Sequence, residues 1–188
     1  MPRFGVARAR SLLLAILSVE IAVLVITGIA LFFLYRPSMS QAWTDVFAES
    51  TDPGVRVAHA LRRIHRLSSY LAVATAVATG VVVALRARTA LRVATGAGIA
   101  GTTVAATFTG LLLPWDQLAL WAVTVGTDMN GYQPLFDDTV RFVLIGGAEV
   151  SRGTMIRWLL VHMLVLGPGL AGLVALAWSH QRSQSEGA

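Results

Sequence analysis

The stretch SLLLAILSVEIAVLVITGIALFFLY, residues 11–35, decides the fold class of this protein. Glu20 is its one charged residue, and nearly all the other side chains are apolar. A helix needs about 20 mostly apolar residues to cross the hydrocarbon core of a bilayer. The stretch is too long for a secretory signal peptide and does not resemble a cleavable one. The sequence therefore predicts a membrane-spanning helix here.

Three further segments have the same character, and we expect them to cross the membrane at about residues 59–85, 91–113 and 155–179. The third span is rich in Ala, Gly and Thr, which is typical of a helix packed closely on its neighbours. The fourth span contains Gly167-Pro168-Gly169, where we expect a kink. The predicted fold class is all-α and integral to the membrane: one domain over residues 1–188 that forms a four-transmembrane-helix bundle.

The composition agrees with this class and excludes others. Of the 188 residues, 13% are charged, against about 25% in soluble domains, which excludes an ordinary cytosolic enzyme. The 15 basic residues are all arginine and lie scattered among apolar blocks, so we expect no nucleic-acid partner. The chain has no cysteine, which excludes disulfides, iron–sulfur clusters, thiolate ligands, covalently attached haem and a cysteine nucleophile.

Arginine placement gives the expected orientation. Arginines are dense at the N-terminus, in the short connection between the second and third spans, and near the C-terminus: Arg3, Arg8, Arg10, Arg86, Arg88, Arg92 and Arg182. Short basic segments of this kind stay in the cytoplasm. We therefore expect a multi-pass protein of the cell (inner) membrane with both termini in the cytoplasm.

The long connection over residues 114–154 then faces outside. Residues 115–123 combine apolar side chains at helical spacing with two tryptophans, which predicts a short helix on the outer membrane surface. A second apolar piece, residues 140–145, is expected to do the same. Asp116 is placed either to cap the first of these helices or to serve a proton or redox role.

Two histidines lie at similar depths in the membrane. His65 and His162 each sit six or seven residues inside the outer end of a span, roughly 10 Å at about 1.5 Å per residue. Such a pair on facing helices is suited to clamp a planar haem, with Arg62 and Arg157 further outward to pair with its propionates. The same histidines are also compatible with simple hydrogen bonds to backbone or headgroups. Zinc is disfavoured, because two histidines fill only half of its coordination sphere.

The residues around these histidines carry a family resemblance. Thr27-Gly28 ends the first span, LRRIHRLS (61–68) opens the second, and LPWDQ (113–117) follows the third, with WAV (121–123) after it. From Thr27 to the chain end, this order resembles the N-terminal four-helix half of cytochrome b, closest to the cytochrome b/b6 type of b6f complexes. The resemblance implies haem b, with His65 and His162 as axial ligands of the outer haem.

The family carries a second, inner haem whose ligands lie about 14 or 15 residues further along the same helices. Those positions hold residues that cannot bind iron: Thr79, and Leu176 or Ala177. The family also places glycines beside each haem edge. Gly28 and Gly110 match the outer pair, whereas the inner positions hold Leu14 and a retained glycine: Gly96. We therefore predict one haem b, on the outer side.

The resemblance implies a monohaem cytochrome b-type electron-transfer subunit of a membrane quinol/quinone redox complex, as in a respiratory chain. Bis-histidine ligation leaves no open iron position, and no nucleophile–base pair is visible, so we expect no catalysis by this chain alone. The expected partners are a C-terminal cytochrome b-like half, a Rieske protein, and a c-type cytochrome or other outer redox protein. Residues 113–127 contribute one wall of a quinone or quinol site. The alternative is a structural membrane anchor whose haem role has degenerated; a transporter is disfavoured because there are no inverted repeats.

Three other ionisable residues in or near the spans need an explanation. Glu20 either bonds to a neighbouring Ser or Thr or serves a proton or quinone site in the space left by the inner haem. His59 and His180 are expected to be interface residues.

Overall fold

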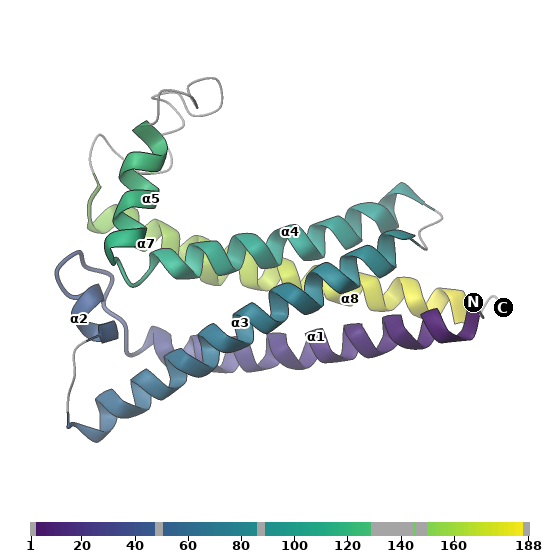
Figure 1. The fold of residues 1–188 in the computed structure, drawn as a ribbon, viewed down its shortest axis with the longest axis horizontal. Helices are drawn as coiled ribbons and strands as arrows, with labels where there is room; N and C mark the ends of the chain where they lie inside the picture. Colours follow the sequence, from purple (N-terminus) through teal and green to yellow (C-terminus); the bar gives the residue numbers. More distant parts are fainter. Residues whose placement is uncertain (1–2, 48–50, 86–88, 129–144, 146–149, 186–188) are drawn as a thin grey trace.

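The computed structural model describes residues 3–47, 51–85, 89–128, 145 and 150–185, and within these residues every regular element is helical (Figure 1). The elements in chain order are α1 (Arg3–Phe32), α2 (Ala42–Phe47), α3 (Pro53–Leu85), α4 (Ala90–Leu112), α5 (Gln117–Asp128), α7 (Arg152–Leu160), the π-helical segment η1 (Val161–Leu166) and α8 (Gly167–Ser185).

Four long helices pack in a ring. α1 packs on α3, α3 on α4, and α4 on α8, and α8 returns to contact α1. α3 and α8 are therefore diagonal neighbours. The start of α1 and the end of α8 lie at the same end of the bundle, where Arg10 Nε donates to Gln181 Oε1 at 3.1 Å (Figure 1). The short helices α2 and α5 lie at the opposite end.

Three helices are long and apolar enough to cross a membrane: Arg8–Phe32, Pro53–Leu85 and Arg152–Arg182. α4 qualifies only together with α5, as a pair bent by 117°. The many small residues of α4 lower its hydropathy, although they suit close packing. The described part of the chain thus has three candidate spans, or four if this bent pair is one.

The second span begins earlier than the sequence predicts. α3 starts at Pro53 rather than near residue 59. Asp52 Oδ1 accepts hydrogen bonds from the backbone N–H groups of Gly54 at 2.6 Å and Val55 at 3.3 Å. An Asp cap followed by Pro at the first helical position is a strong start signal, so the polar first turns extend the helix outward from its apolar part.

The fourth span contains a π turn directly before Gly167-Pro168-Gly169, where we expect a kink. Pro168 has no N–H, so the carbonyl of Leu164 cannot receive the usual bond from four residues ahead. The helix widens in the preceding turn, and the N–H of Gly167 bonds to the carbonyl of His162, five residues back. The irregular turn therefore lies at Val161–Leu166 and contains His162, while α8 resumes at Gly167.

The connection after α4 turns sharply and closes one end of the bundle. Trp115 has a φ of 52°, a left-handed conformation that is uncommon for a residue other than glycine. Asp116 Oδ1 accepts from the N–H of Ala119 at 2.9 Å, so it caps α5 as predicted. α5 then packs against the end of α4 through Leu112, Ala119, Val123 and Ile145. Residues 140–144 of the second expected surface helix lie outside the described residues.

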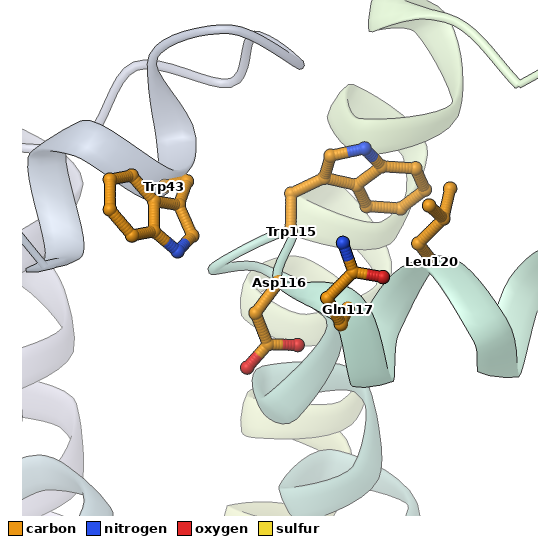
Figure 2. Close-up of a pocket in the computed structure, with 5 residues that line it drawn as sticks. All are labelled: Trp43, Trp115, Asp116, Gln117 and Leu120. Carbon is orange, nitrogen blue, oxygen red and sulfur yellow. The ribbon is translucent and has the colours of Figure 1, made fainter.

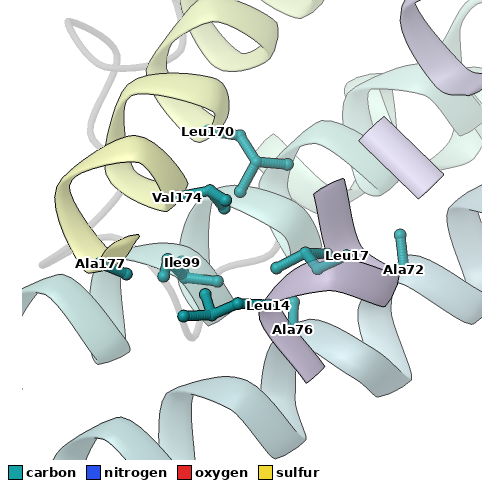
Figure 3. Packing of buried hydrophobic residues seen from close by; sticks show 8 residues of the cluster. All are labelled: Leu14, Leu17, Ala72, Ala76, Ile99, Leu170, Val174 and Ala177. Carbon is teal, nitrogen blue, oxygen red and sulfur yellow. The ribbon is translucent and has the colours of Figure 1, made fainter. Parts of the chain in front are cut away.

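The core of the other half of the bundle is apolar and comes from all four long helices (Figure 3). Figure 3 shows its buried side chains meeting between the helices: Leu14, Leu17, Ala72, Ala76, Ile99, Leu170, Val174 and Ala177. α3 and α4 approach each other closely at Gly80 and Gly96. A Cβ on either glycine would lie 2.6 or 2.7 Å from the carbonyl oxygen of the other.

Candidate functional site

His65 and His162 face each other across the bundle, at the end away from the chain termini. Their ring centroids are 6.2 Å apart, and the rings are inclined by 63°. A metal–imidazole bond is about 2.0–2.1 Å, and the ring centroid lies about 1.1 Å behind the bonding nitrogen. Two imidazoles on opposite sides of one metal ion would thus have centroids about 6.3 Å apart. The observed spacing fits a shared metal ion.

Hydrogen bonds at Nδ1 fix the orientation of both rings. His65 Nδ1 lies 2.8 Å from Thr27 Oγ1, and His162 Nδ1 lies 2.9 Å from the carbonyl of Ala106 and 3.1 Å from Thr109 Oγ1. A carbonyl only accepts, so His162 carries its proton on Nδ1. The hydroxyl of Thr27 donates to the carbonyl of Val23 at 2.7 Å and therefore accepts from His65. Each ring thus keeps the lone pair of Nε2 for a metal ion.

The two threonines were not predicted from the sequence. Thr27 on α1 and Thr109 on α4 are both buried, and each bonds to the histidine of a different helix. A repeated dipeptide signals them, because Thr27-Gly28 and Thr109-Gly110 present the same pair of residues from two helices.

The glycines beside these threonines make room for the imidazoles. A Cβ on Gly110 would lie 3.0 Å from His162 Cε1, and a Cβ on Gly28 would lie 3.3 Å from His65 Cε1. The sequence predicts contact between these glycines and a cofactor edge. In the structure their immediate neighbours are the histidine rings, so each glycine sets how closely a ring approaches the helix behind it.

The two predicted arginines differ in burial, and their role as partners of haem propionates stays a prediction. Arg62 is half-buried, and its Nη1 atom is buried without a hydrogen-bond partner among the described residues. Arg157 is exposed. On an ideal helix, Arg157 is turned about 140° from His162, whereas Arg62 is turned about 60° from His65.

A polar cluster lies near Arg62, beyond Phe32, where the first candidate span ends three residues earlier than the sequence predicts. Tyr35 donates from its hydroxyl to the carbonyl of Leu113 at 2.6 Å, and burial raises the pKa of this phenol. Asp45 accepts from the backbone N–H and the Nε of Arg36, both at 3.1 Å. The Arg36 guanidinium holds the pKa of this carboxyl below its ordinary value. Tyr35 thus ties the end of α1 to the corner after α4.

A cavity of about 290 Å³ opens at the same end of the bundle. Figure 2 shows the residues that line it, Trp43 from α2 and four residues of the α4–α5 corner: Trp115, Asp116, Gln117 and Leu120. Two indoles and a carboxylate give this cavity a mixed aromatic and polar lining.

Among the described residues, the inner level of the bundle holds no comparable pair of metal-binding side chains. Thr79 is fully buried and donates to the carbonyl of Thr75 at 2.7 Å, within its own helix. Leu14 and Ala177 are packed in the apolar core. Gly96, the glycine that matched an inner-haem position, faces Gly80 of α3, so helix packing accounts for it.

Glu20 also lies in this half and accepts from Thr75 Oγ1 at 3.1 Å. Its second carboxyl oxygen is buried without a partner among the described residues. The expected bond to a neighbouring Ser or Thr is therefore present, while a proton or quinone role for Glu20 stays a prediction.

The donor set decides which metal group fits. Among the described residues, no three histidine, aspartate or glutamate side chains gather as a metal cluster. Two opposed imidazoles alone are too few for a tetrahedral zinc site. They fit a metal whose remaining four positions are supplied by a planar ligand.

Comparisons with known proteins agree with the geometry. The profile of one family, Cytochrome b/b6/petB, matches residues 10–181. Cytochrome b6 from Porphyra purpurea is 33% identical over 155 residues, which cover 80% of this chain and 71% of that protein. Cytochrome b6 from Prochlorococcus marinus (strain MIT 9215) is 32% identical over 162 residues, which cover 84% and 73%.

A solved structure has the same fold. It is a chain of a hyperthermophilic respiratory Complex III and superposes with a TM-score of 0.75 at 23% identity. The match covers 93% of this chain and 47% of that one, so this chain spans about half the length of the solved relative.

Proposed function

This chain belongs to the cytochrome b/b6 family, and on that premise we propose that it is a monohaem electron-transfer subunit of a membrane quinol/quinone redox complex. The proposal includes four membrane spans, both termini in the cytoplasm of the cell (inner) membrane, and the histidine pair near the outer surface. The observation that carries it is the opposed pair His65 and His162, with ring centroids 6.2 Å apart.

The residues present fit haem b. Nε2 of each histidine serves as an axial ligand, and Thr27 and Thr109 hold the rings in the ligating tautomer. Haem b, when bound, supplies iron that reversibly takes up one electron. Two protein ligands leave no position for a gas or substrate, which supports electron transfer rather than catalysis at the metal.

The surrounding side chains support this position for the cofactor. Gly28 and Gly110 let the rings sit close to α1 and α4. The buried, unpartnered Nη1 of Arg62 offers a positive group for a haem propionate. Arg157 was predicted for the second propionate, and its exposed position favours a different donor.

One haem is favoured over two because the inner level is already filled. Leu14, Thr79 and Ala177 are fully or almost fully buried there, and none of their side chains can bind iron. A second haem would have to displace the apolar core that joins the four helices.

The proposed partners follow from the part of the family that this chain spans. A C-terminal cytochrome b-like half would complete the subunit, and a Rieske protein, c-type cytochrome or other outer redox protein would exchange electrons with it. The cavity between Trp43 and the α4–α5 corner supports a contribution of residues 113–127 to a quinone or quinol site (Figure 2).

The test is the haem content of the purified complex, measured by the pyridine haemochrome method together with a protein determination. We expect one haem b per chain with a low-spin bis-histidine spectrum. Two haems would contradict the monohaem proposal, and none would favour a structural membrane anchor.

Variants assign the ligands. His65→Ala and His162→Ala are each expected to abolish the spectrum, because each removes an axial ligand. His180→Ala is the matched control, since it removes a histidine at the opposite end of the bundle. A retained spectrum in either ligand variant would contradict the assignment.

A further inference from the structure

Two buried N–H donors near the histidine pair have no partner among the residues that the structure describes. They are Nη1 of Arg62 and the indole Nε1 of Trp158. Leaving a buried donor unpaired costs free energy, so nearly all such groups in folded proteins are hydrogen-bonded. The two donors therefore point to a group that accepts hydrogen bonds at this place.

Each donor precedes one histidine of the pair by about one helical turn. Arg62 precedes His65 by three residues on α3, and Trp158 precedes His162 by four on α7. At about 1.5 Å per residue, the backbone positions of Arg62 and Trp158 lie about 4.5 Å and about 6 Å outward of their histidines. On ideal helices they are turned from these histidines by about 60° and 40°, so each shares the face of its histidine. The two donors thus flank the histidine pair on its outer side, from diagonal helices.

The surroundings of Trp158 keep it near the site. The residue is partly buried and packs on the cluster formed by Leu112, Ala119, Val123 and Ile145, which closes this end of the bundle. Its side chain therefore contacts the residues that join the end of α4 to α5. Arg157, its neighbour in sequence, is exposed.

We propose that the indole N–H of Trp158 donates a hydrogen bond to one propionate of the haem, while Arg62 Nη1 binds the other. This inference rests on the proposed function, because it assigns donors to the acidic groups of that cofactor. Haem carries two carboxylates on one edge. Arg62 and Trp158 each lie within four residues of one histidine of the pair, whereas the third unpartnered nitrogen at this end, Nε2 of His59, lies six residues from His65. Trp158 takes the role that the sequence suggested for Arg157, and the acidic edge of the haem faces outward.

The test is Trp158→Phe in the complete complex, with Trp178→Phe as the matched control. Trp178 is also partly buried and lies in the same span, but its Nε1 donates to Ser18 Oγ at 3.2 Å in the other half of the bundle. Both variants remove one indole N–H and keep an aromatic ring. The haem content and the midpoint potential of the haem are measured for each.

We expect Trp158→Phe to keep its haem and to lower the midpoint potential. Without the donor, the propionate keeps more negative charge close to the iron, which favours the oxidised form. The expected change is at least threefold in the ratio of oxidised to reduced haem at a fixed potential. At 59 mV per factor of ten for one electron, this is about 28 mV or more. Trp178→Phe is expected to leave the potential unchanged.

The outcomes separate the two proposals. If the wild-type complex holds no haem, the proposed function fails. If it holds haem and Trp158→Phe shifts the potential no more than Trp178→Phe does, the role of Trp158 is refuted. If Trp158→Phe accumulates without haem, Trp158→His is tested, because histidine restores an aromatic N–H. Recovery of haem then supports the hydrogen bond, and its absence overturns the proposal.

Discussion

Thr27→Val tests whether the buried threonine hydroxyls hold the axial histidines. Valine keeps the shape of threonine but removes the oxygen that lies 2.8 Å from His65 Nδ1. A net hydrogen bond contributes about 0.5–1.5 kcal/mol, and this one has short, favourable geometry, so we expect a loss near the upper limit. Since 1.4 kcal/mol corresponds to a factor of ten, haem affinity is expected to fall about tenfold.

The same substitution at Thr109 is expected to have a smaller effect. His162 Nδ1 also bonds to the carbonyl of Ala106 at 2.9 Å, and this bond survives the loss of the Thr109 hydroxyl. We expect a cost of about 0.5 kcal/mol, or about twofold in haem affinity. The assay is the rate at which haem transfers from the purified complex to an excess of a haem-free acceptor protein.

Thr79→Val is the matched control. Thr79 is as buried as the other two, but its hydroxyl donates only within α3, at the level of the apolar core. Its replacement is expected to leave the transfer rate unchanged. Equal rates for Thr27→Val and Thr79→Val would refute the reasoning, as would a faster loss from Thr109→Val than from Thr27→Val.

Three further predictions follow from the glycines and the surface ion pair. Gly110→Ala places a methyl 3.0 Å from a site imidazole carbon and is expected to reduce haem content, whereas Gly101→Ala, with open space around its Cβ, is expected to leave it unchanged. Gly80→Ala sets a methyl 2.6 Å from the backbone of α4 and is expected to cost about 1–3 kcal/mol, visible as a lower thermal midpoint in detergent. Asp45→Asn removes the carboxylate that pairs with Arg36. The pKa of Asp45 is lowered in the folded state. The ion pair therefore stabilises the folded protein fully above the ordinary Asp pKa of about 3.9, and this stabilisation is lost as the pH falls through the lowered pKa. The thermal midpoints of wild type and Asp45→Asn are therefore expected to differ slightly at pH 7 and to converge below pH 4, and a gap that widens in acid would contradict this.

Apolar periodicity and spacing were enough to find the four long helices and the histidine pair, but not the short helix α2. An apolar run as long as residues 11–35 predicts a membrane-spanning helix. Two histidines at equal depth on different helices can come into contact only across the bundle. The start of α3 was missed because its first turns are polar. The Asp52 cap followed by Pro53 indicates where the helix starts, whereas hydropathy does not.

Contacts between helices could not be derived in the same way. From the sequence, Gly96 matched a glycine position beside the second haem. The structure shows that it faces Gly80 of α3, a contact that the sequence does not predict. The roles of Thr27 and Thr109 depend on which hydroxyl reaches which imidazole, and this is set by how the helices are rotated about their axes. The π turn shows the limit most clearly, because it shifts the register of the helix within the turn that contains His162.

The Thr-Gly pairs of α1 and α4 give the histidine pair an approximate twofold symmetry. Each imidazole has a threonine oxygen at Nδ1 and a glycine at Cε1, and each of these pairs comes from a different helix. A planar ligand with two different faces therefore contacts the same arrangement of imidazole, threonine and glycine in either of its two orientations, and we call this arrangement the frame. The frame itself therefore gives no preference between the two orientations, and residues that break the symmetry, such as Arg62 and Trp158, must select one of them.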